Sequence, residues 1–150
     1  MRITTKGRYA LRAVVNMAMT SGGKPVPIKK ISEEEEISAE FLEQICFRLK
    51  KAGLIRSVRG PGGGFLLNRP PENISMYDIF EAVGEGAEIA PCIPDCAPGE
   101  GSGAACHRKN VCCAHPTWLK LSREVLGILN GYTVKAIVED SALNPTAARL

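Results

Sequence analysis

The sequence predicts a mainly α-helical protein with a small β-hairpin wing, arranged as a winged helix-turn-helix domain followed by a long C-terminal dimerisation helix. Three stretches with apolar residues at helical spacing precede two short β-type runs, and these runs flank the glycine-rich segment 59–64. After an irregular span, the helical spacing returns from Pro116 onward. This order of elements, helices followed by a two-stranded hairpin, is that of a winged helix-turn-helix.

The first two helices are predicted from apolar spacing and from the residues that interrupt it. We expect a helix over residues 5–19, with Thr5 as its N-cap and a break in the following Ser-Gly-Gly-Lys-Pro segment. A second, short helix is expected to start after Pro27. Its four glutamates, 33–36, are interpreted as a solvated face.

The third helix and the hairpin have clear boundary signals. Ser38 has the chemistry of an N-cap, and Gly53 can close the helix over 39–51 at its C′ position. Two β-type runs, 54–58 and 65–67, then form the predicted hairpin. The glycine-rich segment between them is its tip.

Length and composition set limits on the class of protein. With 150 residues, 45% of them hydrophobic and 23% charged, the chain has the size and composition of one ordinary globular domain. It has no apolar run typical of a membrane span or a secretory signal, so we expect a cytoplasmic protein without a membrane partner. We find no nucleophile with a base, no paired catalytic carboxylates and no phosphate-binding loop, and so expect no enzyme.

The charge is distributed unevenly along the chain. Residues 1–69 hold 13 basic and 6 acidic side chains, a local charge of +7, whereas residues 70–150 hold 6 basic and 10 acidic ones, a local charge of −4. A basic N-terminal half indicates an anionic partner such as nucleic acid.

The third helix and the hairpin tip carry the candidate DNA contacts. The free backbone amides at the helix start, at Ser38, can donate to a phosphate, Gln44 can pair with adenine, and Glu43 can accept from cytosine. A tip with four glycines can approach a groove closely. The predicted contacts are therefore Ser38, Ala39, Glu43 and Gln44 on the helix and Arg59, Gly60, Pro61, Gly62 and Gly63 on the wing. An ordinary mixed-charge surface helix is the alternative.

Five of the six cysteines lie between Cys92 and Cys113. In a reducing cytosol they are more typical of metal ligands or a redox switch than of disulfides. Cys106, Cys112 and His115 form a compact run of possible ligands, and a structural zinc site remains an alternative. Cys46 lies far away in the sequence and is interpreted as a small core residue.

Several motifs together resemble one family. They are the opening Met1-Arg2-Ile3-Thr4-Thr5-Lys6-Gly7-Arg8-Tyr9-Ala10, Pro25-Val26-Pro27, Ile37-Ser38, Leu42-Glu43-Gln44, the wing 58–64 and the run 112–118. On these, the chain is similar to the IscR-like iron–sulfur cluster regulators, bacterial winged-helix repressors that include NsrR.

The resemblance implies a cofactor, partners and sites. It implies a homodimer on palindromic double-stranded operator DNA, with Arg2 among the DNA contacts, and a 2Fe-2S cluster that controls cluster-assembly genes. The implied ligands are Cys92, Cys106, Cys112 and His115. Thirteen residues separate the first two cysteines, more than is usual in the family, so Cys96 remains an alternative first ligand. A 4Fe-4S cluster and zinc remain alternative cofactors.

The expected organisation has four parts: a DNA-binding domain over 1–84, a cluster-binding loop over 85–115, a dimerisation helix region over 116–138 and a flexible tail over 139–150. The dimer stripe has the spacing of a helix seam and comprises Trp118, Leu121, Val125, Ile128 and Tyr132. The alternative is that this stripe packs inside its own subunit. The alternative functions are a DNA-binding repressor with a zinc or thiol-redox site and no cluster, and a small iron–sulfur electron carrier or scaffold.

Overall fold

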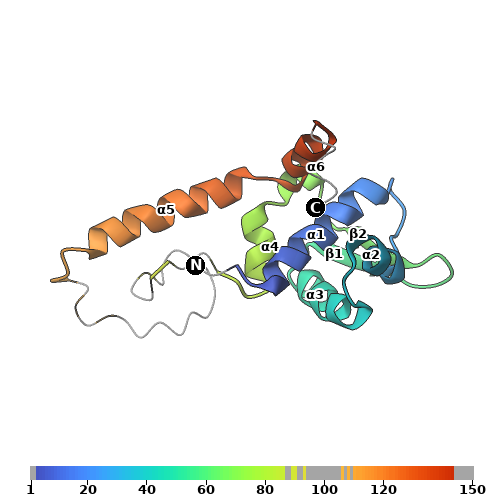
Figure 1. Ribbon diagram of the computed structural model, residues 1–150, viewed down its shortest axis with the longest axis horizontal. Helices are drawn as coiled ribbons and strands as arrows, with labels where there is room; N and C mark the ends of the chain where they lie inside the picture. Colours follow the sequence, from blue (N-terminus) through green and yellow to red (C-terminus); the bar gives the residue numbers. More distant parts are fainter. Residues whose placement is uncertain are drawn as a thin grey trace.

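The computed structural model describes residues 3–86, 89–90, 93, 106, 108 and 110–143. Within these residues the chain forms six α-helices, one short 3-10 helix and a two-stranded antiparallel sheet (Figure 1). In order they are α1 (Thr5–Thr20), α2 (Ile28–Glu35), α3 (Ala39–Lys51), β1 (Ile55–Val58), β2 (Gly64–Leu67), η1 (Pro71–Asn73), α4 (Met76–Ala82), α5 (His115–Gly131) and α6 (Val134–Leu143). The predicted mainly α-helical fold with a hairpin wing is confirmed.

Local chemistry sets the ends of the first three helices. Ser38 Oγ accepts a hydrogen bond from the Phe41 amide at 3.3 Å, as expected for the N-cap of α3, and Gly53 follows that helix with φ of +73°. The expected N-cap of α1 was wrong by one residue. Thr4, not Thr5, caps it, by accepting from the Lys6 amide at 3.2 Å.

The wing is tied to the helical body through one extra bridge. β1 pairs with β2 from Ile55 opposite Leu67 to Val58 opposite Gly64. Val26 and Phe65 exchange two backbone hydrogen bonds, both of 2.9 Å, so the base of the wing is held against the segment before α2. A side chain at Gly64 would overlap the Val26 carbonyl, because the two backbones approach closely there.

The C-terminal part of the chain extends away from the winged-helix body, which comprises α1 to α4 and the wing, and then packs against it again. α4 starts with a capping box between Ser75 and Asp78, and α5 projects from the body as a single long helix (Figure 1). After α5 the chain contacts the start of α4 again. There the Met76 amide donates to the Tyr132 carbonyl at 2.8 Å, and the Val134 amide donates to the Ile74 carbonyl at 2.9 Å. α6 then packs on α1.

These contacts change the expected boundaries near the C-terminus. The expected helix region over 116–138 is two helices with a break at Tyr132 and Thr133, because both residues pair with the start of α4. The first residues of the expected flexible tail, 139–143, lie in α6. The rest of that tail lies outside the described residues.

The core lies between α1, α3 and α4. Fully buried side chains of α1 and α3 meet there, and the wing and α6 close its edges. Tyr9 and Phe41 make an edge-to-face contact, with ring centroids 5.7 Å apart, at the outer end of the same packing. Among the described helices, none is both long and apolar enough to cross a membrane.

The acidic run 33–36 is not simply a solvated face. Asn16, which is buried on α1, donates from Nδ2 to Glu34 Oε2 at 2.9 Å and to Glu35 Oε1 at 3.0 Å. Arg12 Nε lies 2.9 Å from Glu35 Oε2. Two of the four glutamates therefore tie α2 to α1, because a buried amide needs acceptors.

Candidate nucleic-acid interface and cysteine site

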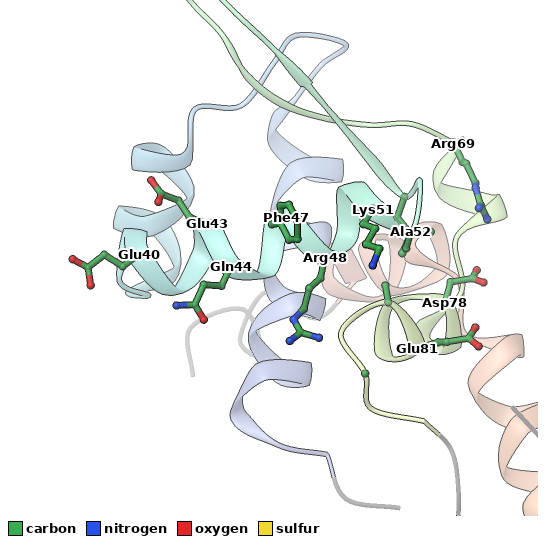
Figure 2. A pocket seen from close by; sticks show the side chains of 13 residues that line it. Glu40, Glu43, Gln44, Phe47, Arg48, Lys51, Ala52, Arg69, Asp78 and Glu81 are labelled. Carbon is green, nitrogen blue, oxygen red and sulfur yellow. The ribbon is translucent and has the colours of Figure 1, made fainter. Parts of the chain in front are cut away.

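The outer face of α3 presents two parallel rows of side chains. Leu42, Ile45 and Leu49 are buried beneath it, which turns the opposite face of the helix to solvent. Each row follows four-residue spacing, and Figure 2 shows them side by side along the helix. One row is Glu40, Gln44 and Arg48, and the other is Glu43, Phe47 and Lys51.

These rows form one wall of a broad, open groove. Arg69 and residues of α4, including Asp78 and Glu81, line the opposite side (Figure 2). Ser38 and Ala39, the predicted contacts at the start of α3, are exposed at the end of the same helix. All four predicted residues of this helix and its N-cap are therefore exposed, and Glu43 and Gln44 among them line the groove.

The wing tip is narrow and bare. Arg59, Gly60, Pro61 and Gly62 are exposed, and Gly63 is half-buried. The tip turns tightly, with the Gly63 amide donating to the Gly60 carbonyl at 2.9 Å and with positive φ at Gly60 and Gly62. Arg2, the remaining predicted DNA contact, lies outside the described residues.

Phe47 was missed in the sequence analysis. Its side chain is 63% exposed, although it follows the buried residues Ile45 and Cys46 directly. An apolar triplet does not by itself reveal which member faces outward. The signal that identifies it is the helical phase, because Phe47 lies four residues after Glu43 and three after Gln44.

Glu85 is a second residue that the sequence did not single out. Its carboxylate accepts from the Thr4 amide at 3.1 Å and from the Gly7 amide at 3.0 Å, and the Thr4 hydroxyl also donates to it. The carboxylate therefore caps the positive end of α1 from 78 residues away. Gly7 permits this approach, since a Cβ there would overlap the carboxylate.

The described part of the cysteine region places His115 at the first turn of α5. Its amide donates to the Cys112 carbonyl at 3.2 Å, so the two residues share one turn of backbone. The imidazole Nδ1 is buried and has no hydrogen-bond partner among the described residues. Such an atom fits a ligand nitrogen, since an unsatisfied buried polar atom costs free energy that a metal would offset.

The other expected ligands are only partly described. Cys106 and Cys112 are half-buried and Cys113 is exposed, all as free thiols. Cys92 and its alternative Cys96 lie outside the described residues. Among the residues that are described, no three ligand-type side chains come together as a metal site.

Cys46 is a core residue, as predicted. It is 1% exposed on the inner side of α3. Burial, together with the negative charge of Glu43, raises the pKa of its thiol from 9.0 to about 12. A thiol held in its neutral form is a poor nucleophile and a poor metal ligand.

The predicted dimer stripe is exposed along α5. Trp118, Leu121, Ile128 and Tyr132 are 40%, 39%, 60% and 51% exposed, respectively, while Val125 is half-buried. Tyr132 follows the last helical residue rather than lying within the helix. A long helix with this many exposed apolar side chains is unusual for a monomer.

The winged-helix fold, the exposed outer face of α3 and the histidine at the start of α5 together define a transcription regulator of the winged helix-turn-helix class. Residues 3–140 match the Rrf2 family, described as iron-dependent transcriptional regulators, and the chain belongs to this family. It is 38% identical over 149 residues to the HTH-type transcriptional regulator IscR of Klebsiella pneumoniae (strain 342), covering 99% of this chain and 86% of the relative. IscR of Escherichia coli (strain K12 / DH10B) is equally similar, with 87% of its length covered.

Solved structures of related proteins share the fold. T. potens IscR superposes with a TM-score of 0.71 at 29% identity, covering 94% of this chain and 88% of that one. CymR, the global cysteine regulator of B. subtilis, also gives a TM-score of 0.71, at 26% identity, covering 93% of this chain and 97% of its own. The family expected from the sequence motifs is therefore confirmed.

Proposed function

We propose that this protein senses iron–sulfur clusters and regulates transcription by binding palindromic operator DNA as a homodimer. Its targets under this proposal are genes for cluster assembly. Residues 1–84 are the DNA-binding unit, 85–115 hold the cluster, and α5 with the following residues forms the dimer.

The observation that carries the proposal is the buried, unpartnered Nδ1 of His115. A lone histidine at a helix start is usually no ligand. Here the side chain follows Cys112 by one turn of backbone, and its ring nitrogen has no protein partner among the described residues. Both features are expected of a histidine that ligates a metal.

The residues that would hold the cluster are Cys92, Cys106, Cys112 and His115. A bound cluster would supply reversible one-electron chemistry and sensitivity to iron and sulfide supply. Histidine is neutral where cysteine is a thiolate, so this set gives the site one negative charge fewer than four cysteines would. That charge difference favours a site that is easily reduced or emptied, as a sensor requires.

The exposed stripe on α5 supports the homodimer. A second copy of α5 would bury the apolar side chains that a single chain leaves in water, and each fully buried large side chain contributes about 1.5–3 kcal/mol. Such a dimer would set its two α3 helices about 34 Å apart, roughly one turn of DNA. Sedimentation should then give a species of twice the 16.1 kDa chain mass.

Two contacts link the proposed cluster loop to the rest of the chain. At its first residue, Glu85 caps α1, and at its last residue, His115 begins α5. Cluster binding within the loop can therefore act on the DNA-binding unit at one end and on the dimer helix at the other. To alter DNA affinity, the cluster must bind one dimer arrangement more tightly than another.

A specific observation also favours a second candidate, a repressor with a thiol-redox site and no cluster. Cys113 is exposed beside Cys112, and one similar structure, at 32% identity with a TM-score of 0.68, is of Staphylococcus aureus CymR in its oxidized form. In this candidate the cysteines themselves would report the redox state.

The test is anaerobic purification followed by a visible absorption spectrum with iron, sulfide and zinc assays. We expect two irons and two sulfides per chain in the native protein and an altered or lost spectrum in His115→Ala. His107→Ala, the change of the only other histidine, is the matched control and should keep the native spectrum. A colourless protein that reconstitution cannot fill would contradict the proposal and favour the second candidate.

A further inference from the structure

Phe47 lies on the exposed face of α3 and is not among the proposed DNA contacts. It lies in one row between Glu43 and Lys51, beside the row that holds Gln44 and Arg48 (Figure 2). Its ring is 63% exposed, and no other residue of α3 is among the exposed large hydrophobic side chains. An apolar ring thus stands alone among hydrogen-bonding and charged groups.

The neighbours of Phe47 restrict what can cover it. Gln44 offers an amide that can pair with a base edge, and Arg48 and Lys51 offer cations that can pair with phosphates. A protein partner that buried Phe47 in an apolar patch would also have to desolvate these polar groups. The DNA major groove presents base edges, phosphates and one apolar group, the C5-methyl of thymine, within the same few ångströms.

The spacing along the helix agrees with this occupant. With a rise of about 1.5 Å per residue, Phe47 lies about 4.5 Å beyond Gln44 and about 6 Å beyond Glu43. Successive bases of one DNA strand are about 3.4 Å apart. A helix that reads bases with Glu43 and Gln44 therefore brings Phe47 to a base one or two steps further along.

We infer that Phe47 is a specificity-determining residue that contacts the methyl group of a thymine in the operator. This inference rests on the proposed DNA binding by α3. It adds a preference that hydrogen bonding alone does not give, because thymine differs from uracil only in this methyl group. Phe47 would then contribute to sequence specificity together with Glu43, which lies in the same row of side chains.

The test uses the full-length protein and duplexes that it selects from a random DNA library. In the selected duplex each thymine is replaced in turn by deoxyuridine, and affinities are measured by fluorescence anisotropy. We expect one thymine per half-site to show a loss of about three- to fivefold, the change that corresponds to burying one methyl group. Phe47→Ala should bind more weakly and lose this dependence, whereas Phe47→Leu should keep part of it.

Met19→Ala is the matched control, since Met19 is another exposed large apolar side chain, 55% exposed, but on α1. It should leave the thymine dependence unchanged. The inference is overturned if Phe47→Ala keeps the full dependence, if its affinity is unchanged, or if no thymine methyl matters to the native protein. Failure to select any duplex would instead overturn the proposed DNA binding, and the Phe47 contact with it.

Discussion

Helix α3 of the winged-helix body and helix α5 have the same spacing of apolar residues, but these residues are buried in α3 and partly exposed in α5. In α3 the apolar side chains Leu42, Ile45 and Leu49 are all fully buried within the chain, whereas in α5 Leu121 and Ile128 remain exposed. The difference lies in the surroundings, because α3 packs between α1, α2 and α4 while α5 projects from the body (Figure 1). Periodicity therefore predicts a helix with an apolar face, but not whether the partner of that face is in the same chain.

The two regions also differ in charge and in thiol chemistry. The body carries the excess of basic side chains and a single buried thiol, and the C-terminal region carries the excess of acidic ones and the cysteine cluster. This contrast predicts a division of labour, with DNA contact in the first region and sensing and assembly in the second. Variants in one region, each compared with a variant in the other, test that contrast.

The largest expected effect is the salt dependence of DNA binding. A dimer that contacts about 6–10 phosphates should lose about 10³- to 10⁵-fold in affinity between 50 and 200 mM salt. Arg59→Gln on the wing removes one phosphate contact from each protomer and should therefore lower the logarithmic salt slope by about two units. Arg123→Gln on the exposed surface of α5 is the matched control and should leave the slope unchanged. A salt-independent affinity would argue against a basic DNA-binding body.

The second expected effect is a difference in thiol reactivity between the two regions. With a pKa of about 12, only about one in 10⁴ of the Cys46 thiols is deprotonated at pH 8, and burial also keeps an alkylating reagent away from the sulfur. We expect iodoacetamide to label exposed Cys113 in the apo protein at least about 10³-fold faster than Cys46, as measured by peptide mass spectrometry.

The same pKa gives a pH dependence of definite sign. A raised pKa favours the protonated thiol in the native state, so this stabilisation is present below pH 9.0 and is lost as pH rises towards about 12. The residual labelling of native Cys46 should increase about tenfold per pH unit over this range. Rapid labelling of Cys46 at pH 8 without denaturant would show that the body opens easily, contrary to its buried core.

The third expected effect separates a buried isoleucine from an exposed one. Ile45→Ala removes a fully buried side chain and should lower the free energy of unfolding by about 2–5 kcal/mol at every protein concentration. Ile128→Ala, which removes a 60% exposed side chain, should instead shift the monomer–dimer equilibrium towards monomer. Urea unfolding at several concentrations and analytical ultracentrifugation distinguish the two. Equal, concentration-independent losses would contradict a dimer through α5.

The elements governed by neighbouring residues were predictable from sequence. Ser38 caps α3 and Gly53 ends it because side-chain oxygens and left-handed glycines act within a few residues. The glycine-rich wing was predictable for the same reason, and the wing motif together with the other short motifs, from the opening residues to the run 112–118, identified the family. Within the candidate site, the helical spacing of the buried residues was enough to predict that Glu43 and Gln44 face away from the core.

The features that were missed depend on distant parts of the chain. Asn16 on α1 donates hydrogen bonds to Glu34 and Glu35, which no local pattern in the glutamate run indicates. The break at Tyr132 follows from pairing with residues near Ser75, 57 positions earlier in the sequence. The start of α1 was misassigned by one residue because the Thr4 amide donates to the carboxylate of Glu85, which lies far along the chain.

The smallest expected effect concerns the point where the two regions meet. Glu85→Ala removes the acceptor for the Thr4 and Gly7 amides and should lower the free energy of unfolding by about 1–2 kcal/mol. Glu33→Ala, which removes only an exposed ion pair with Lys29, is the control and should change it by less than about 0.5 kcal/mol. Thermal or urea unfolding measures both.

A double-mutant cycle with Gly7 makes this prediction specific to the contact. Gly7→Ala alone should be destabilising, because its methyl group would overlap the Glu85 carboxylate. In the Glu85→Ala background the same change should be neutral or stabilising, since alanine favours a helix by about 1 kcal/mol over glycine. Additive effects would mean that Glu85 does not hold the start of α1, and the proposed loop would then act on DNA binding only through α5.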